Sequence, residues 1–208
     1  MSGQERLKRL AAERAVEFVE DGMVLGLGTG STARHVVEIL AERLRDGTLR
    51  DITGVPTSKA TERHAQEVGL PLITLEYEPR LDLTIDGADE IDPDLNLIKG
   101  LGGALLWEKI VATASDRLVI VADASKRVER LGEKAPLPVE VVPFGWTTHL
   151  AFLDLLGAQA TLRQDEKGNP IVTDGGHYLL DCHFEDGILE PDRLERELRS
   201  RVGVVETG

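Results

Sequence analysis

The middle of the chain brings together residue types that can move protons and hold negative charge. The run DGADE at residues 86–90 holds three carboxylates and a glycine. It follows Leu81–Ile85, where apolar and polar residues alternate and aliphatic side chains predominate, as is typical of a buried strand. Ligands of open α/β sheets bind at the carboxyl ends of strands, so the sequence predicts a polar site here. A solvated acidic loop is the alternative interpretation.

A lysine and a glycine run follow the acidic segment. The run KGLGG at residues 99–103 combines a cation with glycines, which allow backbone N–H groups to approach a ligand closely. Residues 104–114 have helix-forming composition and carry Glu108 and Lys109. One strand end, one glycine loop and one helix would thus deliver a lysine and several carboxylates to one site. For Glu108 taken alone, a surface glutamate paired with a nearby cation is the competing interpretation.

A third candidate segment lies near the start of the chain, where GTGST occupies residues 28–32. An apolar strand is expected before it at 23–27, and a helix after it to about Arg45. The N-terminus of such a helix offers free N–H groups and a positive dipole end to a phosphate. The dinucleotide fingerprint fails because Ser31 stands where it needs a glycine, and no Lys-Ser/Thr pair completes a P-loop. A monophosphate or sugar-hydroxyl site and a simple capped turn both remain open.

The elements that must position these segments read as an α/β unit followed by a smaller α+β region. Before residue 132 we expect a first helix at 4–20, a helix at 58–68, and strands at 52–55, 71–75 and 117–122. Prolines and glycines then punctuate the chain. Beyond them we expect strands at 139–142, 160–162, 171–173 and 178–182, helices at 146–156 and 191–199, and a last strand at 202–205.

Composition narrows the classes of function. The 208 residues carry a formal net charge of −13, which argues against a nucleic-acid surface, since phosphate backbones require an excess of Lys and Arg. An anionic substrate would need a local cation, and Lys126 in VADASK (121–126) is a candidate, with a plain surface lysine as the alternative. No run approaches the roughly 18 apolar residues of a membrane span, and no signal peptide is expected at the N-terminus.

The sequence predicts neither a metal site nor a reactive thiol. The five histidines are dispersed and show no metal-ligand spacing, so no metal site is predicted. The single cysteine, Cys182, cannot form an intrachain disulfide, which fits a reducing cytosol. No base neighbours it in sequence, and we expect a buried inert thiol.

Taken together, the motifs resemble type A ribose-5-phosphate isomerase. GTGST at 28–32, DGADE at 86–90, KGLGGALLWEK at 99–109 and VADASK at 121–126 occur in the order and at the spacing of that family. The resemblance extends over essentially the whole chain. One departure is Leu101, which stands inside a segment that the family often writes as an unbroken glycine run, and it bears on how the backbone at 100–102 approaches a ligand.

The resemblance implies an enzyme that interconverts D-ribose 5-phosphate and D-ribulose 5-phosphate in the non-oxidative pentose phosphate pathway of the cytoplasm. It implies a Rossmann-like, mainly parallel α/β sheet flanked by helices and a second, smaller α+β (ferredoxin-like) domain. The predicted domains span 1–130 and 131–201, and the strand at about 202–208 is free to return to the first. A homodimer or homotetramer is expected, with a sugar phosphate as ligand and without cofactor, metal, nucleic acid or membrane.

The family also implies which residues form the site. Glu108 corresponds to the general base. The implied substrate-binding residues are Thr29, Gly30, Ser31, Thr32, Asp86, Gly87, Ala88, Asp89, Lys99, Gly100, Leu101, Gly102 and Lys126.

The chemistry supports four catalytic roles. One carboxylate above the plane of a cis-enediolate reaches both C1 and C2, so Glu108 alone can carry the proton. Lys99 and the glycine loop can stabilise the enediolate oxygen. Asp86 is our choice for opening the sugar ring and Asp89 for orienting hydroxyls, although the sequence leaves the ring-opening residue open between these two.

Two other classes of function compete with the isomerase. A sugar-phosphate-sensing regulatory domain could use the same scaffold without turnover, but it would ordinarily accompany a DNA-binding module. A coenzyme A transferase-like enzyme could share the scaffold and a catalytic glutamate, but it needs room for a larger ligand. An assay of ribulose 5-phosphate formation separates these possibilities.

Overall fold

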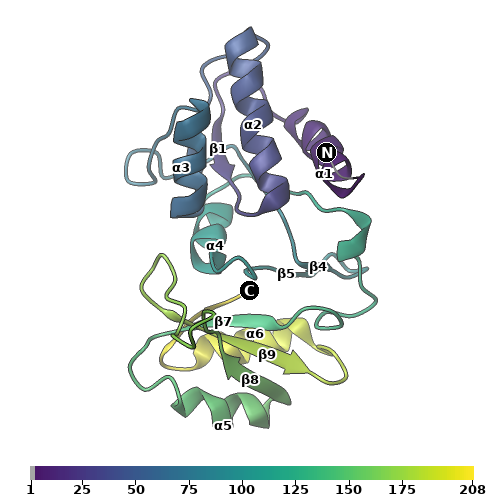
Figure 1. The fold of residues 1–208 in the computed structure, drawn as a ribbon, viewed down its shortest axis with the longest axis vertical. Helices are drawn as coiled ribbons and strands as arrows, with labels where there is room; N and C mark the ends of the chain where they lie inside the picture. The colour runs from purple at the N-terminus through teal and green to yellow at the C-terminus, as the bar shows by residue number, and fades with distance from the viewer. Residues whose placement is uncertain (1–2) are drawn as a thin grey trace. The chain divides into compact units, whose positions relative to one another are not determined.

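The computed structural model describes residues 3–208, which divide into two compact units (Figure 1). The first unit holds the residues up to Gly87 together with Trp107–Ser125, and the second holds Ala88–Leu106 with Lys126–Gly208. The segment 88–106 therefore groups with the C-terminal part of the chain, and its Ile98 is buried in the core of the second unit. As separate domains, the ranges 1–130 and 131–201 stay a prediction.

The first unit is built on a parallel sheet, as predicted. Its strand order is β2-β1-β3-β6, and every neighbouring pair runs parallel. All residues of β3 are buried, as expected for a parallel strand covered on both faces. The strands are β1 (Val24–Leu27), β2 (Thr53–Pro56), β3 (Leu83–Asp86) and β6 (Leu118–Ile120).

Helices flank this sheet and bury the core between them (Figure 1). They are α1 (Gly3–Val16), α2 (Ser31–Asp46), α3 (Lys59–Val68) and α4 (Leu105–Thr113). Local sequence explains where two of these helices begin or end. The Ser58 hydroxyl accepts a hydrogen bond from the Thr61 amide and caps α3, and Gly47 in the left-handed conformation ends α2.

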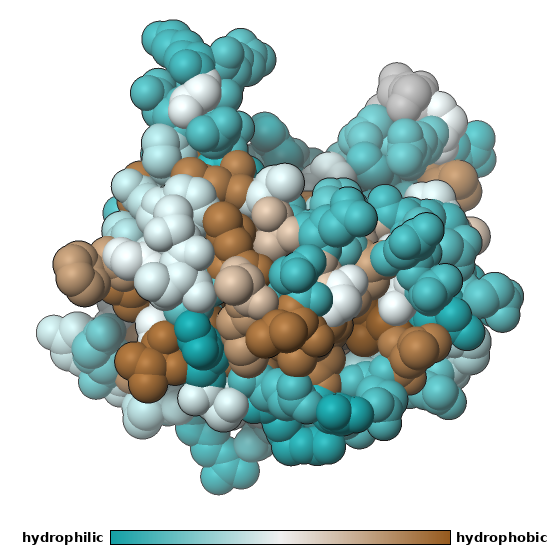
Figure 2. Space-filling view, turned by 90° about the horizontal axis from the view of Figure 1, so that it is seen from below, coloured by the Kyte–Doolittle hydropathy of each residue, from teal (hydrophilic) through white to brown (hydrophobic). Residues whose placement is uncertain are grey.

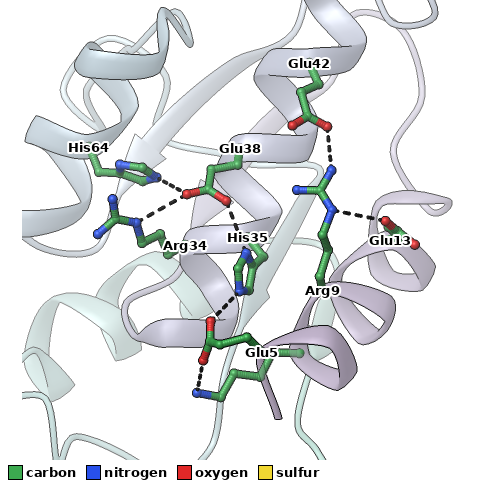
Figure 3. A network of polar contacts seen from close by, with 9 residues as sticks. Glu5, Arg9, Glu13, Arg34, His35, Glu38, Glu42 and His64 are labelled. Atoms are coloured by element: carbon green, nitrogen blue, oxygen red, sulfur yellow. Dashed lines mark hydrogen bonds and ion pairs between the residues drawn. The ribbon is translucent and has the colours of Figure 1, made fainter. Parts of the chain in front are cut away.

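A polar network joins α1, α2 and α3 (Figure 3). The His35 imidazole lies between the carboxylates of Glu5 and Glu38, at 3.0 and 3.1 Å. Glu38 also lies 3.6 Å from a ring nitrogen of His64 on α3. These contacts fix the helix that starts directly after residues 28–30.

The second unit contains an antiparallel sheet with the ferredoxin-like order. Its elements follow each other as βαββαβ, and the strand order β10-β7-β9-β8 places the fourth and third strands on either side of the first. This confirms the predicted small α+β fold. The elements are β7 (Leu137–Val141), α5 (Thr148–Leu155), β8 (Ala158–Leu162), β9 (Tyr178–Phe184), α6 (Pro191–Ser200) and β10 (Val204–Thr207).

The second unit also contains two short strands, and a 3-10 turn lies where the chain enters this unit for the second time. β4 (Glu90–Ile91) pairs antiparallel with β5 (Leu97–Ile98), and the 3-10 turn η1 (Ala124–Lys126) precedes β7. The sequence pattern did not predict the β4–β5 pair, because two-residue strands are too short to show a period.

Three predicted strands need correction. The last strand does not return to the first sheet: β10 pairs with β7, because the ferredoxin-like order leaves that edge of β7 for the strand that follows α6. Residues 71–75 make only one bridge, between Leu72 and Gly54, since Pro71 has no N–H to continue a ladder. Residues 171–173 likewise make a single bridge, between Val172 and Tyr178, next to the turn at 174–176.

The surface of the described residues carries large hydrophobic groups as well as charges. Figure 2 shows a face on which hydrophobic residues gather between hydrophilic ones. Strongly exposed examples in the second unit are Phe144, Leu155, Leu189 and Val202. Among residues 3–208, no helix is both long and apolar enough to cross a membrane.

Candidate active site

Asp86 lies at the carboxyl end of β3, where it is almost completely buried. Its Oδ1 accepts hydrogen bonds from the amides of Thr29, at 3.0 Å, and Gly87, at 2.7 Å. A Cβ at Gly28 would lie 2.2 Å from this oxygen, so only glycine allows β1 to end so close to Asp86. The chain leaves β1 on one side for β2 and later returns to β3 on the other, and this topological switch point is where α/β sheets bind ligands.

The loop after β1 is anchored by hydroxyl groups. The Thr29 Oγ1 lies 2.8 Å from the hydroxyls of Thr57 and Ser58 and 3.1 Å from that of Thr61. The Thr61 hydroxyl also donates to the carbonyl of Gly28. The sequence showed hydroxyl residues at the end of β2, but not that they would meet Thr29.

The N-terminus of α2 is open to a ligand. Gly30 stands at the N-cap with φ +121°, a conformation that favours glycine, and it has no side chain to cap the helix. Ser31 and Thr32 form the first turn, with Ser31 exposed and Thr32 half-buried. The first amides of a 16-residue helix thus lack a side-chain cap, an arrangement suited to an anion.

Glu108 lies in the first turn of α4 and is 4% exposed. The interpretation as an ordinary surface glutamate is therefore wrong. Burying a carboxylate is costly, and such groups concentrate at functional sites. Glu108 belongs to the same compact unit as Asp86 and the 28–32 loop.

Asp89 and the glycine run meet in the second unit. The Asp89 amide donates to the Ile98 carbonyl at 2.8 Å, and its Oδ2 accepts from the Leu101 amide at 3.0 Å. Gly100 and Gly103 have φ of +91° and +82°, and the Gly103 amide donates to the Gly100 carbonyl at 2.9 Å, which closes a tight turn. We call residues 99–103 the glycine turn. Lys99 begins it, and Leu101, at its centre, is 38% exposed.

Lys126 is half-buried at the end of η1. The segment after it is tied to β4, because the Val128 amide donates to the Ile91 carbonyl at 3.0 Å. Glu90, the third carboxylate of DGADE, is fully buried and accepts hydrogen bonds from the amides of Gly132, Lys134 and Ala135. The acidic run thus contains one structural anchor, Glu90, beside the two candidate site residues.

The structure brings the predicted residues together in two groups. Asp86 contacts Thr29 and Gly87 in the first unit, and Asp89 contacts the glycine turn in the second. Ala88 begins the second unit directly after Gly87. Within residues 3–208, no group of three or more His, Cys, Asp or Glu could hold a metal ion.

The thiol of Cys182 behaves as the sequence predicted. It is free and fully buried in the core of the second unit. Burial, with a smaller effect of the neighbouring Asp181 carboxylate, raises the pKa of Cys182 to about 12. The reactive thiolate form is therefore negligible at neutral pH.

The sequence model of ribose 5-phosphate isomerase A (phosphoriboisomerase A) matches residues 53–208. This chain belongs to the ribose 5-phosphate isomerase A family. It is 55% identical over 201 residues to a ribose-5-phosphate isomerase A of Roseiflexus castenholzii, which covers 97% of this chain and 86% of the relative. Members of the family are isomerases, as predicted.

Solved structures of the family have the same fold. A ribose 5-phosphate isomerase from Plasmodium falciparum superposes with a TM-score of 0.94 at 39% identity, covering 98% of this chain and 89% of that one. A D-ribose-5-phosphate isomerase in complex with phospho-erythronic acid gives a TM-score of 0.95 at 41% identity, with the same coverage of 98% and 89%. These likenesses confirm the predicted fold class.

Proposed function

We propose that this chain interconverts D-ribose 5-phosphate and D-ribulose 5-phosphate by proton transfer through a cis-enediolate. Membership of the ribose 5-phosphate isomerase A family is the observation that carries the proposal. The burial of Glu108 in the first turn of α4 supports it, because the reaction needs one well-shielded base.

Glu108 is the base in this proposal. The reaction moves a proton between C2 and C1, on one face of a planar enediolate, while the hydroxyl proton moves in the same direction between O2 and O1. A single carboxylate above that face can remove the proton and return it. General-base catalysis of this kind contributes typically about 10²–10⁴-fold.

Lys99 and the glycine turn stabilise the negative oxygen of the enediolate. A lysine ammonium supplies a full positive charge, and turn amides supply fixed dipoles. The left-handed backbone of Gly100 and Gly103 supports this role because it turns the chain sharply next to the lysine.

An acid–base group must first open the ring form of the aldose. We assign this step to Asp86 and the orientation of substrate hydroxyls to Asp89, with the exchanged roles as the alternative. Two amides donate hydrogen bonds to the Asp86 Oδ1, and a carboxylate held in a fixed position in this way supports the assignment.

The substrate phosphate binds residues Thr29 to Thr32 at the N-terminus of α2, assisted by Lys126. The uncapped helix start supports the first part of this assignment. A chain with a net charge of −13 needs local positive groups to attract a phosphate, which supports the second. We also propose that phospho-erythronic acid, the ligand of the relative described above, binds at the same site.

The proposal includes the setting of the enzyme. It works in the pentose phosphate pathway of the cytoplasm without cofactor or metal, as a homodimer or homotetramer. The exposed apolar residues Phe144, Leu155, Leu189 and Val202 support self-association, since large apolar groups on a surface often mark interfaces.

Turnover in the presence of a chelator tests the function. The purified chain, dialysed exhaustively against EDTA, is mixed with ribose 5-phosphate, and formation of ribulose 5-phosphate is followed. We expect undiminished turnover. Loss of activity that a divalent ion restores would exclude the proposed proton transfer as written, and a chain without turnover under either condition would refute the isomerase.

A further inference from the structure

The glycine turn is held by an arginine far away in the sequence. Arg163 follows β8, and its Nη1 donates to the Leu101 carbonyl at 2.9 Å and to the Gly100 carbonyl at 3.4 Å. The same guanidinium is clamped by Asp181 on β9: the Nε donates to Oδ2 at 2.9 Å, and Nη2 donates to Oδ1. One planar group thus connects two strands of the second unit to two carbonyls of the turn.

The clamp is shielded from solvent. The side chains of Arg163 and Asp181 are 13% and 18% exposed, whereas those of the bidentate surface pair Arg80 and Asp116 are 77% and 49% exposed. A shielded, two-pronged ion pair fixes geometry better than an exposed one, because water and salt screen it less. Arg163 can therefore act as a rigid support for the turn.

The planarity of the peptide unit means that holding a carbonyl of the turn also fixes the direction of the next N–H group. In a trans peptide unit the C=O and the N–H point in opposite directions. Since Arg163 draws the Gly100 carbonyl to one side, the Leu101 N–H points to the other, where the Asp89 carboxylate accepts it. By the same geometry, drawing the Leu101 carbonyl to Arg163 directs the Gly102 N–H to the side of Asp89.

We propose that Arg163, held by Asp181, is a positioning residue that aims the Gly102 N–H of the glycine turn at the developing enediolate oxygen. Successive N–H groups on one side of a turn form a concave site for negative oxygen. The inference rests on the proposed function, because it names a support for the same charge stabilisation. It also accounts for Leu101 in a glycine run, because both contacts use the backbone N–H and C=O of this residue and neither uses its side chain.

The test compares Arg163→Met with its parent and with Arg80→Met. Arg163→Met keeps the length of the side chain and removes its donors, so we expect kcat to fall about 10- to 100-fold, as for a displaced oxyanion donor, with KM changed less than about 3-fold. Arg80→Met, which breaks the exposed bidentate pair, should leave both constants unchanged. A folded Arg163→Met protein with parental kcat would overturn the inference.

Binding separates positioning from general damage. Phospho-erythronic acid carries an anionic carboxylate that can report on the turn, whereas inorganic phosphate reports on the loop at 29–32. Titration calorimetry of Arg163→Met should show weaker binding of phospho-erythronic acid, by about 10-fold or more, and parental binding of phosphate. Equal weakening of both ligands would indicate a general structural role and contradict positioning.

A double-mutant cycle examines the part of Asp181. If Asp181 acts only through Arg163, Asp181→Asn should lower kcat about 3- to 10-fold, and the pair of substitutions should cost no more than Arg163→Met alone. Should Arg163→Met fail to fold, Asp181→Asn decides: a parental kcat would refute the clamp. If the parent chain has no isomerase activity, the proposed function fails, while the two-ligand titration still tests the role of Arg163.

Discussion

The loop at 28–32 and the glycine turn are both rich in glycine, yet different forces hold them. In the loop, hydroxyl groups surround the Thr29 side chain, and the Thr29 amide donates to the Asp86 carboxylate. Charged groups hold the turn from two sides, with Asp89 on an N–H and Arg163 on two carbonyls. The loop also ends in an uncapped helix start, whereas the turn begins with Lys99.

From this difference we expect the loop to contribute mainly to substrate binding and the turn mainly to catalysis. A helix N-terminus interacts with a phosphate equally in substrate and transition state, so it lowers KM without raising kcat. Rigidly held donors near a cation favour the state in which charge develops, so they raise kcat. We therefore expect changes in the turn to affect the rate and changes in the loop to affect affinity.

Between the loop and the turn, the largest effect should follow removal of the charge at the turn. Lys99→Met keeps the length of the side chain and should lower kcat about 10²–10³-fold, because the enediolate oxygen loses its cation. KM should change little. Steady-state kinetics check this split, and a variant whose KM rises while kcat persists would place Lys99 with the binding residues instead.

A smaller effect, of the other kind, should follow changes at the phosphate site. Ser31→Ala and Lys126→Ala should each raise KM by about 10- to 100-fold, since each contact with a phosphate contributes roughly 1.5–3 kcal/mol. kcat should stay near the parental value. If the variant with both substitutions still prefers phosphorylated over unphosphorylated ribose as strongly as the parent does, Ser31 and Lys126 do not bind the phosphate.

The smallest effect concerns the stability of the unit that carries the turn. His149 is buried there, and desolvation, together with the nearby Arg201, lowers the pKa of its imidazole below the ordinary 6.5. Below pH 6.5 the unfolded chain therefore binds a proton more readily than the folded one, and stability falls as the pH falls. The slope for one such proton is at most about 1.4 kcal/mol per pH unit.

Urea unfolding at pH 7.5 and pH 5.5 measures this effect. The free energy of unfolding of His149→Gln should fall less between pH 7.5 and pH 5.5 than that of the parent. His183→Gln, a change at an exposed position of the same unit, should leave this pH dependence unchanged. Identical pH dependence in the parent and His149→Gln would show that another group dominates acid sensitivity.

The same contrast explains how much the sequence could predict. The loop at 28–32 was recognisable because strand, glycines, hydroxyls and helix start are contiguous, and the hydrophobic pattern predicted most strands and helices. The three contacts of the Thr29 hydroxyl and the Arg163 clamp could not be predicted, because they join segments far apart: Arg163 is 62 residues from Leu101. Side-chain direction after β8 depends on the pairing of β8 with β9, which no local pattern encodes.

The pairing of strands could not be predicted for the same reason. The apolar residues of β10 predicted a strand, but not its neighbour, because periodicity carries no information about partners. Pro71, which limits residues 71–75 to a single bridge, was visible in the sequence, and so was the turn at 174–176 that follows residues 171–173. Burial of Glu108 was also out of reach, since a glutamate in the first turn of a helix is common at a surface.

The central claim is that Glu108 carries the proton between C1 and C2. Glu108→Gln keeps the size and hydrogen-bonding ability of the side chain but removes the basic oxygen. Exchange of the C2 proton of ribose 5-phosphate with deuterated solvent, followed by NMR alongside turnover, tests the claim directly. We predict that exchange and kcat fall together, by about 10²–10⁴-fold or roughly 3–5 kcal/mol in the barrier, while phospho-erythronic acid still binds. Parental exchange and turnover in Glu108→Gln would contradict the account and leave the base unidentified.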